Sequence, residues 1–197
     1  MNTSINRFIR QGGFNMVEVL VTLTVLLIGL LGLAGTMMHG HRSEAESYQR
    51  AQALVLLQDM VARINANRNV ASCYAFTTDA AAGTPYLGTS STAVPACAAG
   101  TATQNALALQ DMAEWSALLN GAAEVATNNN ANLGAMNGAR GCVTYDASTG
   151  VYQVSVAWQG LGKTAAPPAA WNCAKGNYGD EKWRRVVSVT LRIAALD

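Results

Sequence analysis

An uncharged stretch near the N-terminus is the feature that most constrains this chain. From Val19 to His41 no Asp, Glu, Lys or Arg occurs, and most of the residues are apolar. About 20 such residues are enough to cross a bilayer as a helix. Two arginines without acids, Arg7 and Arg10, precede the stretch. By the positive-inside rule, the N-terminus is therefore expected in the cytoplasm and everything after about residue 42 on the far side of the membrane.

Two simpler interpretations of this stretch compete. A secretory signal peptide has an apolar core of only about 7 to 15 residues, which ends at a small-residue cleavage site. The apolar run of this chain is longer and continues into a sequence compatible with a helix, which disfavours that interpretation. A plain membrane anchor accounts for the length but not for Glu18, a carboxylate placed directly before the uncharged run. A charge at the centre of a span costs about 2.5 to 3.5 kcal/mol on insertion scales, less near an edge, and usually marks function. We therefore expect Glu18 to have a partner of opposite charge.

The residues GGFNMVEVL, at positions 12–20, resemble the class III signal of type IV prepilins. In that family a prepilin peptidase cuts after a glycine on the cytoplasmic face, and the new first residue is N-methylated. The resemblance implies cleavage after Gly13, methylation of Phe14 and an assembly role for Glu18, the fifth residue after the cut. In the family this glutamate neutralises the amino end of a neighbouring subunit, and such a pair is stronger in an apolar surround than in water.

A single long helix is predicted from about Phe14 to about Asn67, because no proline occurs before Pro85. At about 1.5 Å per residue it would be roughly 80 Å long. Its part 14–41 is apolar all round and is expected to lie first in the membrane and later in the filament core. Its part 42–68 is expected to be amphipathic. The apolar stripe predicted for this part consists of Ala51, Leu54, Leu57, Val61 and Ile64.

The remaining segments are a leader, residues 1–13, which is expected to be removed, and a periplasmic or extracellular head, residues 69–197. All four cysteines of the chain, Cys73, Cys97, Cys142 and Cys173, lie in the head. Their spacing lacks the CxxC pairs of a zinc site, so two disulfides in an oxidising compartment are expected. Of the three pairings we favour Cys73 with Cys97 and Cys142 with Cys173, because each bridge then closes a local loop.

Alternation of period two predicts the strands of the head. Tyr152, Val154, Val156 and Trp158 share one face, and Trp158 is expected in the core. Val143 and Tyr145 belong to a partner strand across the turn Asp146–Gly150, and residues 187–193 form the last strand. A short strand is predicted around Cys73–Phe76 and a second helix over Leu107–Leu119. The predicted fold is α+β and pilin-like, a long N-terminal helix packed on a small antiparallel sheet.

The sequence shows little sign of catalysis or of nucleic-acid binding. The two histidines, His39 and His41, point to nearly opposite sides of a helix, and no GxSxG, P-loop or HExxH motif occurs. Asp180 and Glu181 are expected in a solvated turn rather than at a calcium ion. Removal of residues 1–13 leaves 13 − 2 = 11 basic residues against 12 acidic ones. We expect no enzyme activity, no cofactor, no metal and no nucleic-acid partner.

Within the family, the run Glu18–Gly35 and the segment Asp111–Trp115 look most like minor pilins of the PilV kind. This resemblance implies a subunit that helps to prime assembly of a type IV pilus at or near its tip, with roles in cell adhesion and twitching motility. Implied partners are other minor pilins, the major pilin, the prepilin peptidase, the pilus assembly platform and, before assembly, inner-membrane lipid. The alternatives are a minor pseudopilin of a type II secretion system and a membrane-anchored periplasmic binding module.

Overall fold

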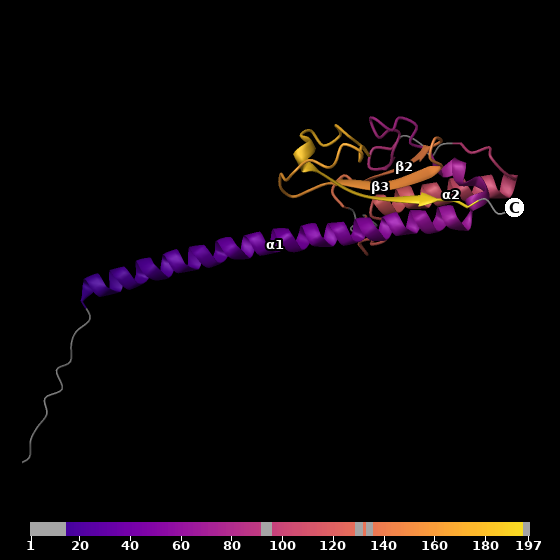
Figure 1. Cartoon of the computed structure of the whole chain (residues 1–197). Helices are drawn as coiled ribbons and strands as arrows, with labels where there is room; N and C mark the ends of the chain where they lie inside the picture. The colour runs from indigo at the N-terminus through magenta and orange to yellow at the C-terminus, as the bar shows by residue number, and fades with distance from the viewer. Residues whose placement is uncertain (1–14, 92–95, 129–131, 133–135, 195–197) are drawn as a thin grey trace, which may run out of the picture. The chain divides into compact units, whose positions relative to one another are not determined.

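The computed structural model describes residues 15–91, 96–128, 132 and 136–194. In chain order its elements are α1 (Met16–Ala66), the 3-10 helix η1 (Arg68–Tyr74), β1 (Leu87–Gly88), α2 (Ala102–Leu119), β2 (Arg140–Asp146), β3 (Val151–Gln159), the 3-10 helix η2 (Glu181–Trp183) and β4 (Arg184–Arg192) (Figure 1). The chain divides into two compact units, residues 1–44 and 45–197, and the boundary falls inside α1. We call the second unit the head.

Helix α1 is 51 residues long and enters the head with a buried stripe. The buried residues are Ala53, Leu57, Met60 and Ile64, at the intervals of four, three and four that keep side chains on one face. The predicted stripe is therefore wrong in its first turns, because Ala51 and Leu54 are exposed. Ala51 lies two steps of three residues before Leu57. Each step of three residues falls about 60° short of a full helical turn, so the Ala51 side chain points about 120° away from that of Leu57.

The four strands form one antiparallel sheet in the order β1-β2-β3-β4. Val143 of β2 lies opposite Val154 of β3, which in turn lies opposite Val189 of β4. The predicted turn between β2 and β3 is confirmed. Gly150, at φ +68°, donates its N–H to the carbonyl oxygen of Asp146 at 2.8 Å, and the Asp146 carboxylate accepts hydrogen bonds from Ser148 and Thr149.

The two faces of the sheet have different partners. One face carries Val143, Val154, Val156, Trp158 and Val187, which join the buried stripe of α1 and the buried side of α2 in the main core. Figure 1 shows α2 and the second half of α1 on the same side of the sheet. On the opposite face, Cys142 and Ala157 form a smaller cluster with Cys173, Ala174 and Tyr178. The predicted α+β fold, a long N-terminal helix packed on a small antiparallel sheet, is confirmed.

Two local predictions differ from the structure. Helix α2 begins at Ala102, five residues earlier than predicted, because Thr101 and Gln104 form a capping box that satisfies the first N–H groups of the helix. The strand predicted around Cys73–Phe76 is wrong, since residues 68–74 form η1. The N–H groups of Val70 and Ala75 donate to the carbonyl oxygens of Asn67 and Ser72, three residues before them, so this backbone is satisfied locally without a partner strand.

Two disulfides close loops of the head, Cys73–Cys97 and Cys142–Cys173, whose partners are 24 and 31 positions apart in sequence. This is the pairing that the sequence favoured. The first bridge ties the end of η1 to the segment before α2, and the second ties β2 to the segment before η2. Each bridge is expected to stabilise the head by roughly 3 to 4 kcal/mol, because it restricts the unfolded chain.

A glycine in β2 provides a test of the main core. A Cβ atom on Gly141 would overlap the indole ring of Trp115 and lie 2.8 Å from Cδ1 of Leu119. We expect Gly141→Ala to lower the free energy of unfolding by about 1 to 3 kcal/mol, because both neighbours are fully buried. Gly162→Ala is the matched control, since its Cβ would meet no atom within 4 Å. Urea unfolding followed by tryptophan fluorescence measures both, and equal midpoints would contradict the packing described.

Candidate functional site

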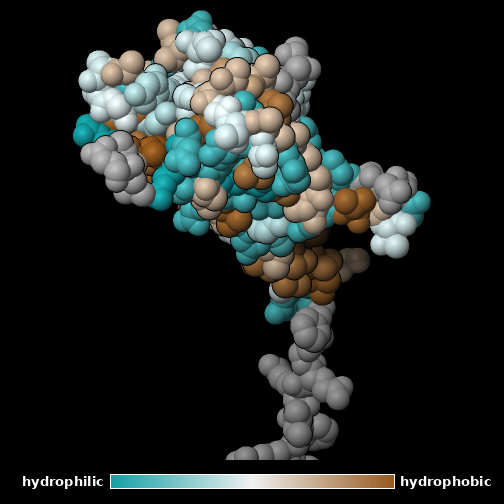
Figure 2. Space-filling model, turned by 90° about the vertical axis from the view of Figure 1, so that its right-hand side faces the viewer, coloured by the Kyte–Doolittle hydropathy of each residue, from teal (hydrophilic) through white to brown (hydrophobic). Residues whose placement is uncertain are grey.

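The N-terminal half of α1 presents its apolar side chains outward. From Met16 to Met38 the large hydrophobic side chains are between 45% and 89% exposed. In the part of the chain that the structure describes, α1 is the one helix long and apolar enough to cross a membrane, and its most apolar window is not buried at all. Figure 2 shows brown, hydrophobic side chains on the surface of this part of the chain. A surface of this kind requires lipid or other apolar helices around it.

The hydroxyl groups in this half of α1 are satisfied within the helix. Thr22, Thr24 and Thr36 donate hydrogen bonds to the carbonyl oxygens three residues before them, at 2.9, 2.8 and 2.8 Å. Burying a hydroxyl without a hydrogen bond is costly, and these bonds remove that cost. The threonines therefore do not prevent this half of α1 from entering an apolar environment.

Glu18 is the exception. It lies in the first turn of α1, and its backbone N–H donates to the carbonyl oxygen of Asn15 at 2.8 Å. Its carboxylate is exposed and has no hydrogen bond or ion pair to any residue that the structure describes. The positive end of the helix favours an acid at this position but does not neutralise it. The predicted processing residues Gly13 and Phe14 lie outside the described residues.

The structure does not bring the two histidines together. His41 faces Glu44, with 3.5 Å between the imidazole nitrogen and the carboxylate, whereas His39 lines a small apolar pocket with Gly35, Met38 and Arg42. No group of three or more His, Cys, Asp or Glu side chains suited to a metal ion occurs among the described residues. The histidines at this end of the apolar half therefore do not form a shared site.

The acids before β4 are already engaged by protein groups. Asp180 accepts a hydrogen bond from the Lys182 N–H and pairs with Lys163 at 3.0 Å, and these two contacts lower its pKa. Burial alone would raise the pKa of Glu181, but hydrogen bonds from Arg184 and from the Gly176 N–H outweigh it and lower the pKa. These carboxylates fix the entry into β4.

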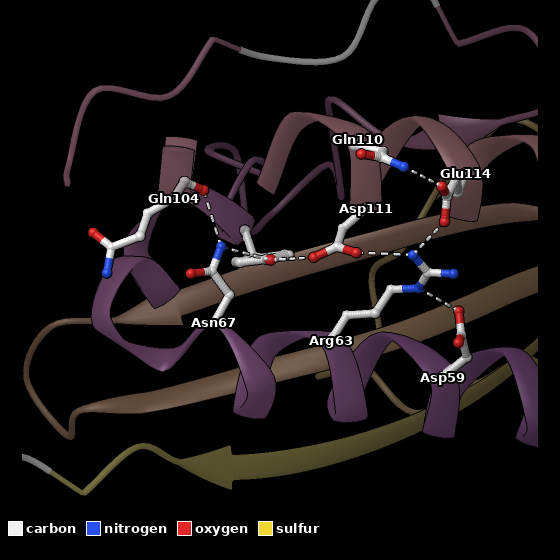
Figure 3. Close-up of polar contacts among 8 residues, drawn as sticks. Asp59, Arg63, Asn67, Gln104, Gln110, Asp111 and Glu114 are labelled. Atoms are coloured by element: carbon white, nitrogen blue, oxygen red, sulfur yellow. Dashed lines mark hydrogen bonds and ion pairs between the residues drawn. The ribbon is translucent and has the colours of Figure 1, made fainter. Parts of the chain in front are cut away.

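A second polar site lies inside the head, around Arg63 (Figure 3). The Arg63 guanidinium donates to three carboxylates, those of Asp59 at 2.8 Å, Asp111 at 2.9 Å and Glu114 at 2.8 Å. Asp59 is on α1 with Arg63, whereas Asp111 and Glu114 are on α2. One cation therefore joins the two helices at a place where three negative charges would otherwise repel one another.

The network continues from Asp111 into η1. The second oxygen of the Asp111 carboxylate accepts a hydrogen bond of 2.5 Å from the Tyr74 hydroxyl. The side-chain amide of Asn67 donates to the Tyr74 oxygen at 3.2 Å and to the backbone carbonyl of Gln104 at 3.0 Å. We call the eight residues of Figure 3 the Arg63 network: Asp59, Arg63, Asn67, Tyr74, Gln104, Gln110, Asp111 and Glu114.

The pKa shifts in the network show a structural role. Burial alone would lower the pKa of Arg63, but its bonds to Glu114, Asp59 and Asp111 raise it overall. Burial raises the pKa of Tyr74, and the bond to Asp111 raises it further. The bond from Arg63 lowers the pKa of Glu114. Near neutral pH the guanidinium stays charged and the phenol stays protonated, so neither group exchanges a proton there and the network serves to position the helices.

This network was not predicted from the sequence. Two signals pointed toward it. Asp59 and Arg63 are four residues apart on a helix, a spacing that favours an ion pair. Asp111 lies four residues before Trp115, so a carboxylate falls on the buried side of α2, where a charged group needs partners. Neither signal identifies which residues of α2 contact Arg63, or which residues of α1 contact Asp111.

The fold and the exposed apolar helix define a class. A long N-terminal helix packed on a four-stranded antiparallel sheet is the pilin-like α+β architecture. A family model described as "Tt1218-like: Type IV pilin Tt1218" matches residues 39–115, less than half of the 197 residues, and supports a type IV pilin subunit. The matched stretch contains the whole Arg63 network. No curated protein and no solved structure matches the chain significantly.

Removing the Arg63 charge tests the network. We expect Arg63→Met to lower the free energy of unfolding by about 2 to 3 kcal/mol, because Asp111, which is only 8% exposed, then keeps its charge without a cation. Glu114→Gln is the matched control, since that side chain is about half exposed and its loss should leave the unfolding midpoint nearly unchanged. Asp111→Asn added to Arg63→Met should recover part of the loss. Equal decreases in the free energy of unfolding for Arg63→Met and Glu114→Gln, measured by urea unfolding, would contradict a stabilising role of the Arg63 network.

Proposed function

We propose that this protein is a minor pilin subunit of a type IV pilus, which is cleaved after Gly13 and assembled through the N-terminal half of α1. The observation that carries the proposal is Glu18, which has no partner among the described residues and lies at the start of an exposed apolar helix segment whose three threonine hydroxyl groups are bonded internally. The type IV pilin match over residues 39–115 supports the same class of protein.

Cleavage would supply the cation that Glu18 lacks. Within one chain, the new amino group on Phe14 would lie four residues before Glu18. In a filament, a neighbouring subunit shifted along the axis would place its own Phe14 amino group at about the same depth as this Glu18. Two opposite charges 4 Å apart attract by about 1 kcal/mol in water and by about 4 kcal/mol at the effective dielectric near a protein. Assembly into an apolar filament core would therefore favour the subunit arrangement that brings the two groups together.

The proposed location follows from the same segments. Before assembly, residues 14–41 cross the inner membrane once, with the leader 1–13 in the cytoplasm and the head in the periplasm. After assembly, the same helix leaves lipid for the filament core and the head lies on a cell-surface pilus. The proposed partners are the prepilin peptidase, the assembly platform, other minor pilins and the major pilin. The resemblance of Glu18–Gly35 and Asp111–Trp115 to minor pilins of the PilV kind supports a place at or near the tip.

Processing is tested first, by mass spectrometry of the protein purified from its own cells. We expect the mature chain to begin at an N-methylated Phe14. Gly13→Leu should leave the precursor uncleaved, because the residue before the cut is changed, whereas Gly12→Ala, one position further away, should be processed. An intact Met1 terminus in cells with an active prepilin peptidase would contradict the proposal.

Assembly is tested by the charge on Glu18. We expect Glu18→Gln to insert and be cleaved but to reach sheared filaments at least about tenfold less, a change of about 1.4 kcal/mol in the assembly equilibrium. Glu44→Gln is the matched control, because that carboxylate is also exposed on α1 and faces only His41. Immunoblots of filament and membrane fractions measure both variants. Normal amounts of Glu18→Gln in filaments would show that the carboxylate is dispensable.

A further inference from the structure

A pocket of about 260 Å³ lies in the head at the start of β4. Its walls are mainly apolar and come from the segment 165–168, from two tryptophans and from β4. Three arginines complete the lining. Its lining includes Arg50, Trp158, Trp171, Arg184, Arg185 and Val187. The pocket belongs to neither the apolar half of α1 nor the Arg63 network.

The pocket lies at the open edge of the sheet. Successive residues of a strand point to opposite faces, and the four consecutive residues 184–187 all line the pocket, so it reaches around the outer side of β4. β4 is the last strand of the sheet, and among the described residues its backbone from 185 to 192 makes hydrogen bonds to β3 alone. The outward N–H and C=O groups of this edge are available to an added strand.

Two of the three arginine charges are already neutralised. Arg184, 2% exposed, pairs with Glu181 and donates to the carbonyl oxygens of Trp171 and Cys173. Arg185 pairs with Glu46 at 3.2 Å and donates to two further carbonyl oxygens. Arg50 is exposed and has no hydrogen bond or ion pair within the described part of the chain. Arg50 is therefore the cation that this pocket offers to a ligand.

The indole N–H of Trp158 is a second group without a partner. Trp158 is 3% exposed, and its Nε1 atom is buried without a hydrogen bond to any described residue. The other fully buried tryptophan, Trp115, donates its N–H to the carbonyl oxygen of Leu56 at 2.8 Å. Buried N–H donors are rarely left unpaired in native proteins. Because Trp158 lines the pocket, its unpaired N–H is a candidate donor to a ligand that binds there.

We propose that this pocket binds an acidic side chain within an extended segment of another protein. The segment pairs with the free edge of β4, and its carboxylate accepts hydrogen bonds from Arg50 and from the Trp158 N–H. A carboxylate fits this pair because it is an acceptor only and has two oxygens. Apolar residues beside it contact Trp171 and Val187. This binding is separate from filament assembly through α1 and does not depend on it.

The first experiment uses the full chain in detergent micelles, with the tryptophan indole groups labelled with ¹⁵N. The chain has four tryptophans, so four indole N–H signals are expected in the spectrum. N-acetyl-phenylalanine, which carries a carboxylate and an apolar side chain, should shift the Trp158 signal at concentrations of about 1 mM. The Trp115 signal, which is bonded internally, should not move. N-acetyl-phenylalanine amide, which lacks the charge, should bind at least about fivefold more weakly, and equal binding of the two compounds would overturn the proposal.

Two variants assign the contacts. Arg50→Gln and Trp158→Phe should each weaken binding of N-acetyl-phenylalanine about five- to tenfold, because each removes one donor to the carboxylate while keeping most of the side-chain bulk. Arg68→Gln is the control, since Arg68 is also exposed but lines a different pocket. The remaining indole signals report whether each variant is folded. Wild-type affinity in a folded Arg50→Gln variant would overturn the assignment.

A pair of blocked peptides tests whether the ligand is a protein segment. Acetyl-TVEVTV-amide should bind at least about tenfold more tightly than N-acetyl-phenylalanine and should slow hydrogen exchange at the outward amides of β4, because it adds backbone hydrogen bonds. The peptide with Gln in place of Glu should lose most of this gain. If the Glu peptide bound no better than the small carboxylate and left exchange in β4 unchanged, the proposal of an extended protein segment would be wrong.

Discussion

Burial of Trp115 is the contact on which the head depends. The residue belongs to α2, its ring lies against Gly141 of β2, and its N–H donates to the carbonyl oxygen of Leu56 in α1. One side chain thus joins the second helix, the sheet and the long helix. The absence of a side chain at position 141 is as necessary as the tryptophan, because the ring occupies the space that a Cβ would need. The Arg63 network then fixes the relative position of the same two helices from the polar side.

Helix α1 combines two different kinds of surface in one continuous helix. In its first half, the apolar side chains face outward, the threonine hydroxyls are bonded within the helix, and Glu18 has no partner among the described residues. In the head, one stripe of α1 is buried and the neighbouring side carries Asp59 and Arg63. A helix satisfies its own backbone in lipid, in a filament core and against a sheet, so it is suited to all three surroundings.

Several elements of the head could be predicted because their causes are local. The strands β2 and β3 alternate apolar residues around a turn that ends in a glycine at positive φ, and the structure confirms them. The Thr101 and Gln104 capping box was visible in the sequence and would have placed the start of α2 correctly. The stripe of α1 was harder to predict, because Ala51 and Leu54 are apolar and helical phase alone decides which neighbours turn inward.

By itself, the sequence determined the long apolar helix, the acid at its start, the alternating strands and the segments joined by the cysteines. Each of these follows from the composition or spacing of residues close together in the chain. Only the tertiary structure decided that Arg63 meets Asp111, 48 residues away, and that Trp158 and Arg50 line one pocket. Contacts of this kind depend on how elements pack, and packing is set by the fit of whole surfaces, which no local pattern of residues encodes.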